Sequence, residues 1–418
     1  MVTTCRRCLY TSDHPLGITF DETGLCSGCQ VHEEKDRLDW DERWQELETL
    51  VKPFRTKGPT YDCIVPVSGA RDSFFLADLV VNRLKMNPLM VSYNRYFNTP
   101  TGIGNLAQLR MHFDVDFQQK HVDPRTVRGI TRHALYQFGN PYWHCLAGET
   151  VFPVQMAVMM GIPLIIWGAH QGLEQVGMFS HLENVEMTRR YRKDHDLFGV
   201  DAQDFAGPFD DLGEEDLINY RYPAFSDIEA LGLVGIYLGN YVRWDPYAQH
   251  LSMVSQAGYR GRPLNRTFDC YDHADCYVYT GLHDVLKYFK HGYGKVTDQA
   301  CREIRFGRMT RDQALRIVAH YEEQEPGHLD LFCKFLGTDP WSLRMVVNRH
   351  RNPKFFEEIA PNVWRRRRAR PEGMTAEGIL DYPGCDPAER DKDNRYITVG
   401  RGVDWPEQRC PDGQPRYF

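Results

Sequence analysis

The periodicity of hydrophobic positions changes near residue 60. Before that point apolar residues recur every three to four positions between Leu38 and Val51, which predicts an amphipathic helix within 32–54 that Pro53 ends. From residue 60 onward, short apolar runs alternate with helical patterns, which predicts an α/β fold with a doubly wound, mostly parallel sheet. The expected strands lie at 63–67, 89–93, 117–122 and 163–168, and the expected helices at 73–84, 104–113, 127–138 and 149–160.

Beyond residue 240 the strand patterns become rare and helical patterns dominate, as at 283–290 and 311–323. The last stretch is rich in Pro, Gly and Arg, and it predicts an irregular tail that wraps the body or docks a partner, with disorder as the alternative. We therefore expect an amino-terminal ribbon at 1–35, a connecting helix at 36–59, an α/β domain at 60–245, a helical substrate or partner region at 246–360 and the tail at 361–418.

Composition narrows the functional classes. The chain has 418 residues and a net charge of −7, from 50 Lys+Arg and 57 Asp+Glu, which disfavours a nucleic-acid binder. The most apolar run, 154–169, contains Gln155, Gly161 and Pro163, and it is too short and broken to cross a bilayer. The first residues lack the apolar stretch of a signal peptide, so we expect no membrane insertion and a cytoplasmic location.

Four of the 12 cysteines form a C-x2-C-x17-C-x2-C pattern, namely Cys5, Cys8, Cys26 and Cys29. In a reducing compartment two such knuckles are typical of a four-thiolate zinc site rather than of disulfides. Because sulfur fills all four positions, this zinc would be structural. An iron–sulfur cluster or the absence of metal are the alternatives.

A candidate anion loop follows the first expected strand. Its residues are Ser68, Gly69, Ala70, Arg71, Asp72 and Ser73. Small residues let the backbone approach an anion, and the helix amino terminus supplies partial positive charge. Arg71 can bind phosphate oxygens, and Asp72 can brace the loop or hold Mg²⁺. On spacing alone, an ordinary helix cap with a turn explains the hexapeptide equally well.

The hexapeptide resembles the S-G-G-x-D-S loop of PP-loop ATP pyrophosphatases, with Ala70 in place of the second Gly and Arg71 where a Lys is usual. The resemblance is broader than the loop. Together with the cysteine pattern, the segments 97–106, 236–241, 271–276 and 290–298 are similar to the N-acetyl sugar amidotransferase family of lipopolysaccharide and flagellin-glycan biosynthesis. The similarity runs from Cys5 to about Phe356.

That resemblance implies an ATP-dependent enzyme that uses Mg²⁺. It implies conversion of an acetamido group on a nucleotide-activated sugar to an acetamidino group, through adenylation of the amide oxygen and attack by ammonia. The ammonia would come from a glutaminase subunit, with or without a cyclase-like companion, because the chain shows no glutaminase nucleophile of its own.

The resemblance also implies roles for particular residues. Asp72 and Arg71 would act in catalysis with Glu174, which would take over the carboxylate role because His170 replaces the family's acidic residue. A hydrogen-bonded histidine at a strand end is the other interpretation of His170. The candidate substrate-binding residues are Lys290, His291, Tyr293, Lys295 and Asp298, for which a solvated basic helix face is the alternative.

Two rival functions stay open. A PP-loop enzyme that thiolates tRNA would use a lone cysteine such as Cys145 as sulfur carrier, although a buried packing cysteine explains Cys145 as well. The departures at Ala70, Arg71 and His170 are also compatible with a catalytically weakened scaffold for a glutaminase.

Overall fold

Five parallel strands form the central sheet of the computed structural model, in the spatial order β3-β2-β1-β4-β5. They span Cys63–Pro66 (β1), Pro88–Tyr93 (β2), Asp116–Lys120 (β3), Leu164–Trp167 (β4) and Val234–Tyr237 (β5). The structure describes residues 2–56, 60–183, 193, 197–205, 211–367 and 382–385. The chain starts in the middle of the sheet, builds one half, and returns to build the other, which confirms the doubly wound topology expected from the sequence.

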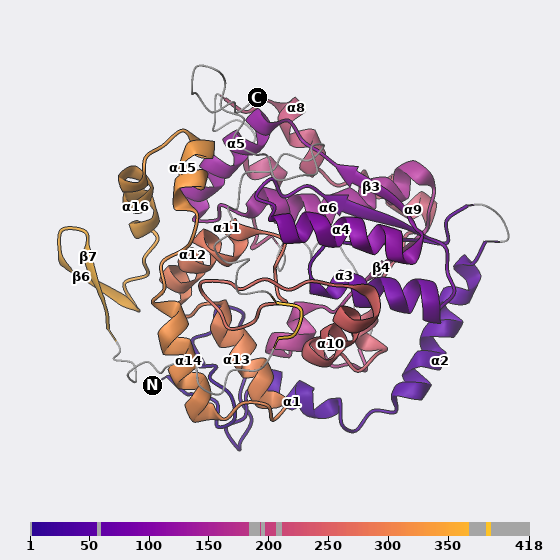
Figure 1. The fold of residues 1–418 in the computed structure, drawn as a ribbon, viewed down its shortest axis with the longest axis horizontal. Helices are drawn as coiled ribbons and strands as arrows, with labels where there is room; N and C mark the ends of the chain where they lie inside the picture. Colours follow the sequence, from indigo (N-terminus) through magenta and orange to yellow (C-terminus); the bar gives the residue numbers. More distant parts are fainter. Residues whose placement is uncertain are drawn as a thin grey trace.

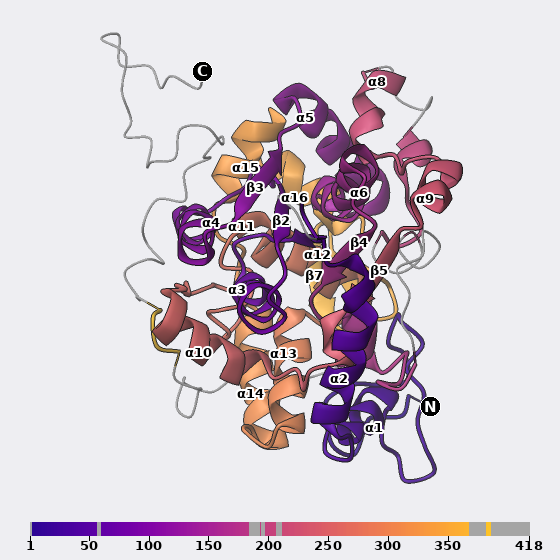
Figure 2. The ribbon, with the colours of Figure 1, turned by 90° about the vertical axis from the view of Figure 1, so that its right-hand side faces the viewer.

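Alternate residues of the inner strands enter two separate cores. Val65 and Met90 pack with one cluster, whereas Ile64 and Leu89 pack with another. Helices α3 (Arg71–Ala77) and α4 (Pro100–Phe113) contribute to the first core, and α6 (Trp143–Met160) contributes to the second. Figure 2 shows α4 and α6 on opposite sides of the strands. Burial on both faces explains why these strands are continuous apolar runs rather than alternating ones.

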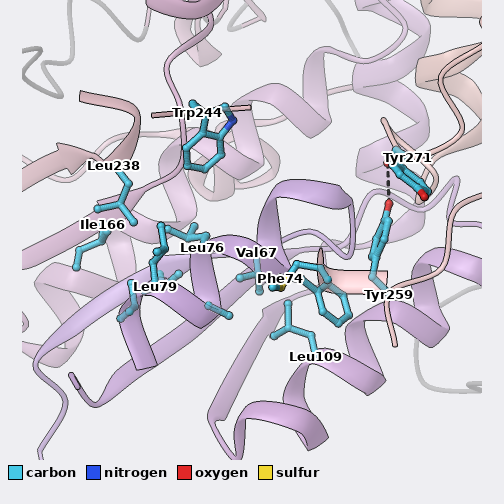
Figure 3. Close-up of a cluster of buried hydrophobic side chains, with 14 of the residues drawn as sticks. Val67, Phe74, Leu76, Leu79, Leu109, Ile166, Leu238, Trp244, Tyr259 and Tyr271 are labelled. Atoms are coloured by element: carbon cyan, nitrogen blue, oxygen red, sulfur yellow. Dashed lines mark hydrogen bonds between the residues drawn. The ribbon is translucent and has the colours of Figure 1, made fainter. Parts of the chain in front are cut away.

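The first core extends from the sheet to the loops beyond it. Figure 3 shows Phe74 of α3 and Leu109 of α4 in one cluster that also holds Trp244. The Tyr259 hydroxyl donates to the carbonyl oxygen of Tyr271 at 2.6 Å, so a polar group in this core is satisfied. The ring of Phe74 also packs on Tyr259, with the centroids 5.3 Å apart, so α3 is anchored to the carboxyl-terminal half of the chain.

Helices α4 and α6 begin earlier than the sequence pattern predicts. Thr99 caps α4 by accepting a hydrogen bond from the amide of Gly102 at 3.0 Å, and Pro100 occupies the first turn. A Pro-Thr-Gly segment looks like a loop, but Pro is favoured at the first helical position. Strand β5 was not among the expected strands, because it contains Gly235 and lies at an edge of the sheet, where its first two residues are not buried.

The other helices lie before the sheet, around it and after it along the chain. Helix α1 (Ser27–Glu34) closes the cysteine ribbon, and α2 (Trp40–Val51) is the expected connecting helix. The helices around the sheet and in the carboxyl-terminal part are α5 (Pro124–His133), α8 (Glu214–Leu217), α9 (Phe225–Leu231), α10 (Pro246–Ala257), α11 (Tyr277–Thr280), α12 (Leu282–His291), α13 (Lys295–Arg305), α14 (Arg311–Glu322), α15 (Leu329–Leu336) and α16 (Pro340–Asn348). Single turns of 3-10 or π helix lie at η1 (Lys52–Phe54), η2 (Asp78–Arg83), η3 (Ala134–Phe138), η4 (Gly172–Val176), η6 (Ala202–Phe205), η7 (Ile218–Tyr220) and η8 (Leu238–Asn240). Figure 1 shows α13 and α14 beside the amino-terminal ribbon.

A β-hairpin crosses the point where the irregular tail was expected to begin. Strand β6 (Phe356–Ala360) pairs with β7 (Val363–Arg366), and Asn362 takes a positive φ of 60° in the turn. The Arg365 guanidinium pairs with Glu357 across the hairpin at 2.5 Å. Residues 363–366 are therefore not irregular, because cross-strand ion pairs support a strand that the Arg run alone does not suggest. Apart from Tyr382–Cys385, the tail beyond residue 367 lies outside the described residues.

None of the helices in the described part of the chain combines the length and the apolar character needed to cross a bilayer.

Candidate functional site

A cavity of 590 Å³ opens where the strand order reverses between β1 and β4. The loop after β1 contributes Arg71 and Asp72, and the segment after β4 contributes Ala169 and Glu174. Helices α12 and α13 close the opposite side. Ligands bind at this position in open α/β sheets, because the carboxyl ends of two neighbouring strands diverge there.

Hydrogen bonds within the loop after β1 and a positive φ at Gly69 fix the conformation of the loop. Gly69 has a φ of +77°, and a Cβ there would meet the carbonyl oxygen of Gly102 at 2.6 Å. The Ser68 amide donates to Ser73 Oγ at 2.9 Å, and the Ala70 amide donates to Ser68 Oγ at 3.3 Å. Ala70 has a φ of −84°, which any residue adopts, so its replacement of a Gly causes no backbone strain.

Arg71 lies among carboxylates. Its Nε is 3.3 Å from Asp72 Oδ1 and 3.8 Å from Asp272 Oδ1, and its Nη1 is 3.5 Å from Asp269 Oδ2. Burial lowers the pKa of this guanidinium, but Asp272 and Asp72 outweigh burial and raise the pKa above its usual value. Arg71 is therefore a fixed positive charge at the mouth of the loop.

Asp72 points into the cavity and is held from two sides. Burial opposes its ionisation, but Arg71 and a hydrogen bond from His250 Nε2 at 3.1 Å keep the pKa of Asp72 below its usual value. The side chain is 41% exposed, which reflects its contact with the space of the cavity. An ionised, accessible carboxylate next to an anion loop is suited to hold Mg²⁺.

The segment after β4 contains His170 and Glu174, whose roles the sequence left open and whose surroundings differ in the structure. His170 is buried, its Nδ1 accepts from the Gly172 amide at 3.0 Å, and its ring packs on Tyr237. This agrees with a hydrogen-bonded histidine at a strand end. Glu174 lines the cavity, but its Oε2 pairs with Lys35 at 2.5 Å. Burial opposes ionisation of Glu174, and Lys35 and His181 outweigh it and lower its pKa.

The five candidate substrate-binding residues all line the same cavity, namely Lys290, His291, Tyr293, Lys295 and Asp298. Two of them also tie the helices to the cysteine ribbon. The Tyr10 hydroxyl donates to Asp298 Oδ1 at 2.7 Å, and the Tyr293 hydroxyl lies 2.7 Å from His14 Nε2. The structure thus brings these residues together with Arg71, Asp72 and Glu174, and their individual roles stay predictions.

The ammonium of Lys295 lies against an aromatic ring. Its ammonium lies 2.9 Å from the centroid of the Tyr279 ring, and within the described residues no carboxylate is within 4.0 Å of it. It is the first residue of α13, where the helix dipole disfavours a positive charge. Burial lowers the pKa of Lys295 to about 7, although Asp272 acts in the opposite direction. Burial also lowers the pKa of Lys290 to about 8.

Sequence analysis missed several residues of the site. Asp269 binds Arg71 and also Arg302, whose Nη2 lies 2.6 Å from Asp269 Oδ2, and His250 holds Asp72. Both lie far along the chain from the loop, and neither stands in a recognisable motif. Both residues lie on segments that the fold returns to the carboxyl edge of the sheet. The spacing of residues along the sequence does not reveal this return.

The four ribbon cysteines converge on one point. Their Sγ atoms all lie within 4.8 Å of one another, and the thiols of Cys5 and Cys29 are 3.8 Å apart. Four sulfurs at this separation fit a tetrahedral ion with metal–sulfur bonds of about 2.3 Å. Arg305 Nη2 lies 3.9 Å from the Sγ atoms of both Cys8 and Cys26, so a cation supports the thiolates from outside.

Cys145 is poorly placed for sulfur transfer. Its side chain is fully buried, and its Sγ contacts His144 Nε2 at 3.3 Å. Burial raises the pKa of the Cys145 thiol well above its usual value, so the thiolate is disfavoured. This is the behaviour of a packing cysteine.

Fold and site together define a doubly wound α/β protein whose ligand crevice lies between a glycine loop and a basic helical region. Within that class, residues 265–369 match the family described as LPS biosynthesis protein WbpG-like, C-terminal domain. This match confirms the resemblance to a lipopolysaccharide-biosynthesis family over about a quarter of the chain. It includes Lys290, Lys295 and Asp298.

Three other proteins are similar to this chain at low sequence identity. The uncharacterized protein MJ1599 of Methanocaldococcus jannaschii is 26% identical over 112 residues, which are 27% of this chain and 40% of that protein. The chain thus spans less than half of this relative. The structure of NMN synthetase from Francisella tularensis aligns with a TM-score of 0.28 and 11% identity, over 53% of this chain and 96% of that one. The U34-tRNA thiolase NcsA from Methanococcus maripaludis, with its [4Fe-4S] cluster, aligns with a TM-score of 0.26 and 10% identity, over 77% and 89%. These scores are too low to support a functional argument.

Proposed function

We propose that this chain is an ATP-dependent amidotransferase that converts the acetamido group of a nucleotide-activated sugar into an acetamidino group. One observation carries the proposal. A single cavity joins the loop after β1 to Lys290, Lys295 and Asp298, which belong to the region matched by the lipopolysaccharide-biosynthesis family.

The loop side of the cavity suits a triphosphate. Arg71 is held as a cation, and the amino terminus of α3 adds partial positive charge to the same place. Asp72 and Asp272 both face the cavity, and Mg²⁺ is usually held by one or two carboxylates together with substrate phosphates. These residues would place the α-phosphate and screen its charge.

The helical side suits an anionic sugar nucleotide. Lys287, Lys290, Lys295, Arg302 and Arg305 all line it. A diphosphate and a sugar carboxylate would find donors there without displacing the loop. The acetamido oxygen could then approach the triphosphate held on the opposite wall.

The chemistry needs no side-chain nucleophile. The amide oxygen attacks the α-phosphorus, an O–P bond forms, and pyrophosphate leaves with the electron pair of the broken P–O bond. Ammonia then forms a C–N bond to the imidate carbon, loses a proton to water, and the C–O bond breaks as AMP departs with its electron pair. The protein contributes positioning and electrostatic stabilisation.

The metal of the ribbon and the ammonia donor are part of the proposal. Four thiolates supported by Arg305 fit a structural zinc, and metal analysis separates zinc from an iron–sulfur cluster. A glutaminase partner would supply ammonia, and ammonium chloride would replace it in a test tube.

The deciding experiment incubates the full chain with ATP, Mg²⁺, ammonium chloride and a panel of nucleotide-activated N-acetyl sugars. Conversion lowers the mass of the substrate by about 1 Da, because NH replaces oxygen, and releases one AMP and one pyrophosphate for each product. Absence of a mass change with every sugar, or the same change without ATP, would refute the proposal.

A further inference from the structure

A second cavity lies directly behind the first. It has a volume of 220 Å³ and lies between the ribbon, helix α14 and Arg366 of the hairpin. Three residues line both cavities, namely His14, His291 and Tyr293. These side chains border both spaces, and they come from the ribbon, from the end of α12 and from the turn after it, so the ribbon forms part of the partition.

The partition is uncharged. The Tyr293 hydroxyl lies 2.7 Å from His14 Nε2, and their ring centroids are 5.0 Å apart. Burial lowers the pKa of His14 to about 4, with Lys287 and Arg305 acting in the same direction and Asp298 against them. Burial also lowers the pKa of His291 to about 3, with Lys290 and Lys287 in the same direction. Both rings are neutral near neutral pH, and their nitrogens can exchange hydrogen bonds with a small neutral molecule.

The two cavities differ in the charged side chains that line them. The carboxylates of Asp13 and Glu322 and the guanidinium of Arg366 line the outer cavity, and Arg366 Nη1 lies 3.9 Å from Glu322 Oε2. The apolar side chains of Leu315, Val318 and Ala319 on α14 lie next to them. The carboxylate of Glu322 accepts from the Gly294 amide at 2.6 Å, and that of Asp13 lies 3.3 Å from Lys354 Nζ. The inner cavity carries the lysines and arginines described above together with the carboxylates of Asp72, Glu174, Asp272 and Asp298. The partition between the two cavities offers a cation no carboxylate, so it favours passage of the neutral form.

We propose that the outer cavity and the His14–Tyr293 partition form the entrance for ammonia. The inference rests on the proposed amidotransferase function. ATP and a nucleotide-activated sugar would fill the inner cavity from its open side, so a third substrate needs a separate route that excludes water. Ammonium gives up its proton to water in the outer cavity, and neutral ammonia crosses and forms the C–N bond to the imidate carbon.

Exclusion of water has a measurable consequence. If water reaches the imidate carbon first, a C–O bond forms, AMP leaves, and the original acetamide is restored. ATP is then consumed without product. The ratio of pyrophosphate to amidine therefore reports whether ammonia reaches the imidate carbon before water does.

Two substitutions narrow the entrance without touching the inner cavity. Leu315→Trp and Val318→Trp both add bulk from α14 at half-buried positions that line the outer cavity. We expect each to lower kcat/KM for ammonium by at least about tenfold, to leave KM for ATP unchanged, and to raise the pyrophosphate-to-amidine ratio above one. Ile218→Trp, at a 63% exposed position outside both cavities, adds a similar bulk as a matched control.

The outcomes separate this inference from the function on which it rests. If the wild-type chain makes amidine and both Trp variants keep its ammonium kcat/KM and its coupling ratio, the entrance is elsewhere. If the wild-type chain makes no amidine with any sugar, the proposed function fails and the ammonia route fails with it. Thermal melting of each variant shows whether it is folded. Leu315→Ala widens the entrance and should keep the pyrophosphate-to-amidine ratio of the wild-type chain.

Discussion

Lys295 should make substrate binding depend on pH in the neutral range. Its ammonium faces the cavity without a carboxylate partner within 4.0 Å among the described residues, and burial lowers its pKa to about 7. An anionic sugar nucleotide would bind the protonated form. Above pH 7 the free protein must take up a proton on binding, so affinity falls as pH rises, whereas below pH 7 this residue adds no further change.

The magnitude follows from the pKa values. At pH 8 a group with a pKa of about 7 is roughly 90% deprotonated, which weakens binding about tenfold, or about 1.4 kcal/mol. Lys290, with a pKa of about 8, adds a second decline above pH 8. Lys295→Arg keeps its charge throughout and should remove the first decline while leaving the second.

Calorimetry in two buffers of different ionisation enthalpy measures both affinity and proton uptake. The probe is the nucleotide-activated sugar that the mass-spectrometric panel identifies as substrate. At pH 8 the wild-type chain should take up about 0.9 proton at Lys295 and about 0.5 at Lys290, and Lys295→Arg only the latter. Lys334→Arg, at an exposed position on α15, is the control. Equal proton uptake by the wild-type chain and Lys295→Arg would refute this account of the cavity.

Three further predictions concern the loop and the ribbon. Gly69→Ala should lower the free energy of unfolding by at least about 1–2 kcal/mol, because the φ of Gly69 is +77° and the new Cβ would meet the Gly102 carbonyl oxygen. Ala70→Gly, the control, should change the free energy of unfolding by no more than about 1 kcal/mol. Urea unfolding compares the two variants, and equal stability would contradict the loop geometry. Asp72→Asn should reduce sugar-dependent pyrophosphate release at least about 100-fold while metal content and melting temperature stay unchanged, and undiminished release would place Asp72 outside the active site. Cys26→Ser should lose the bound metal and lower the melting temperature. Cys333→Ser, a control at another buried position, should keep the metal. Metal analysis of both variants tests this, and one metal per chain in Cys26→Ser would exclude the four-thiolate site.

The sheet could be predicted from sequence because its central strands are buried on both faces. The apolar runs at 63–67 and 163–168 stand out from their surroundings, and they became β1 and β4. Strand β5 gave a weaker signal because it lies at the edge, where Val234 is 36% exposed. The hairpin of β6 and β7 was missed because Glu357 and Arg365 stabilise it by pairing with each other, and a charged run without its partner is typical of an irregular segment.

The site could be predicted only where a local motif marks it. The loop at 68–73 and the segment at 290–298 were found as separate motifs, and the fold brings Arg71 and Asp72 of the loop into one cavity with that segment, whereas Ser68 lines another cavity. Asp269 and His250 could not be found in this way, because they act on Arg71 and Asp72 through contacts made across almost 200 residues of chain. Such contacts depend on the three-dimensional path of the segments after β5, which no periodicity specifies.

The ribbon has more than a local structural role, because one helix contacts both the cysteine cluster and the cavity. On α13, Arg305 places Nη2 at 3.9 Å from Cys8 Sγ and Cys26 Sγ, while its Nη1 donates to the Gln175 carbonyl at 2.7 Å beside the cavity. On the same helix Asp298 accepts from the Tyr10 hydroxyl of the ribbon and also pairs with Lys287. If the cysteines became protonated after loss of a bound metal, Arg305 would lose the negative charge beside its Nη2. Helix α13 therefore joins the four cysteines to the cavity, so a metal bound by these cysteines would be coupled to the placement of Arg305 and Asp298 in the cavity wall.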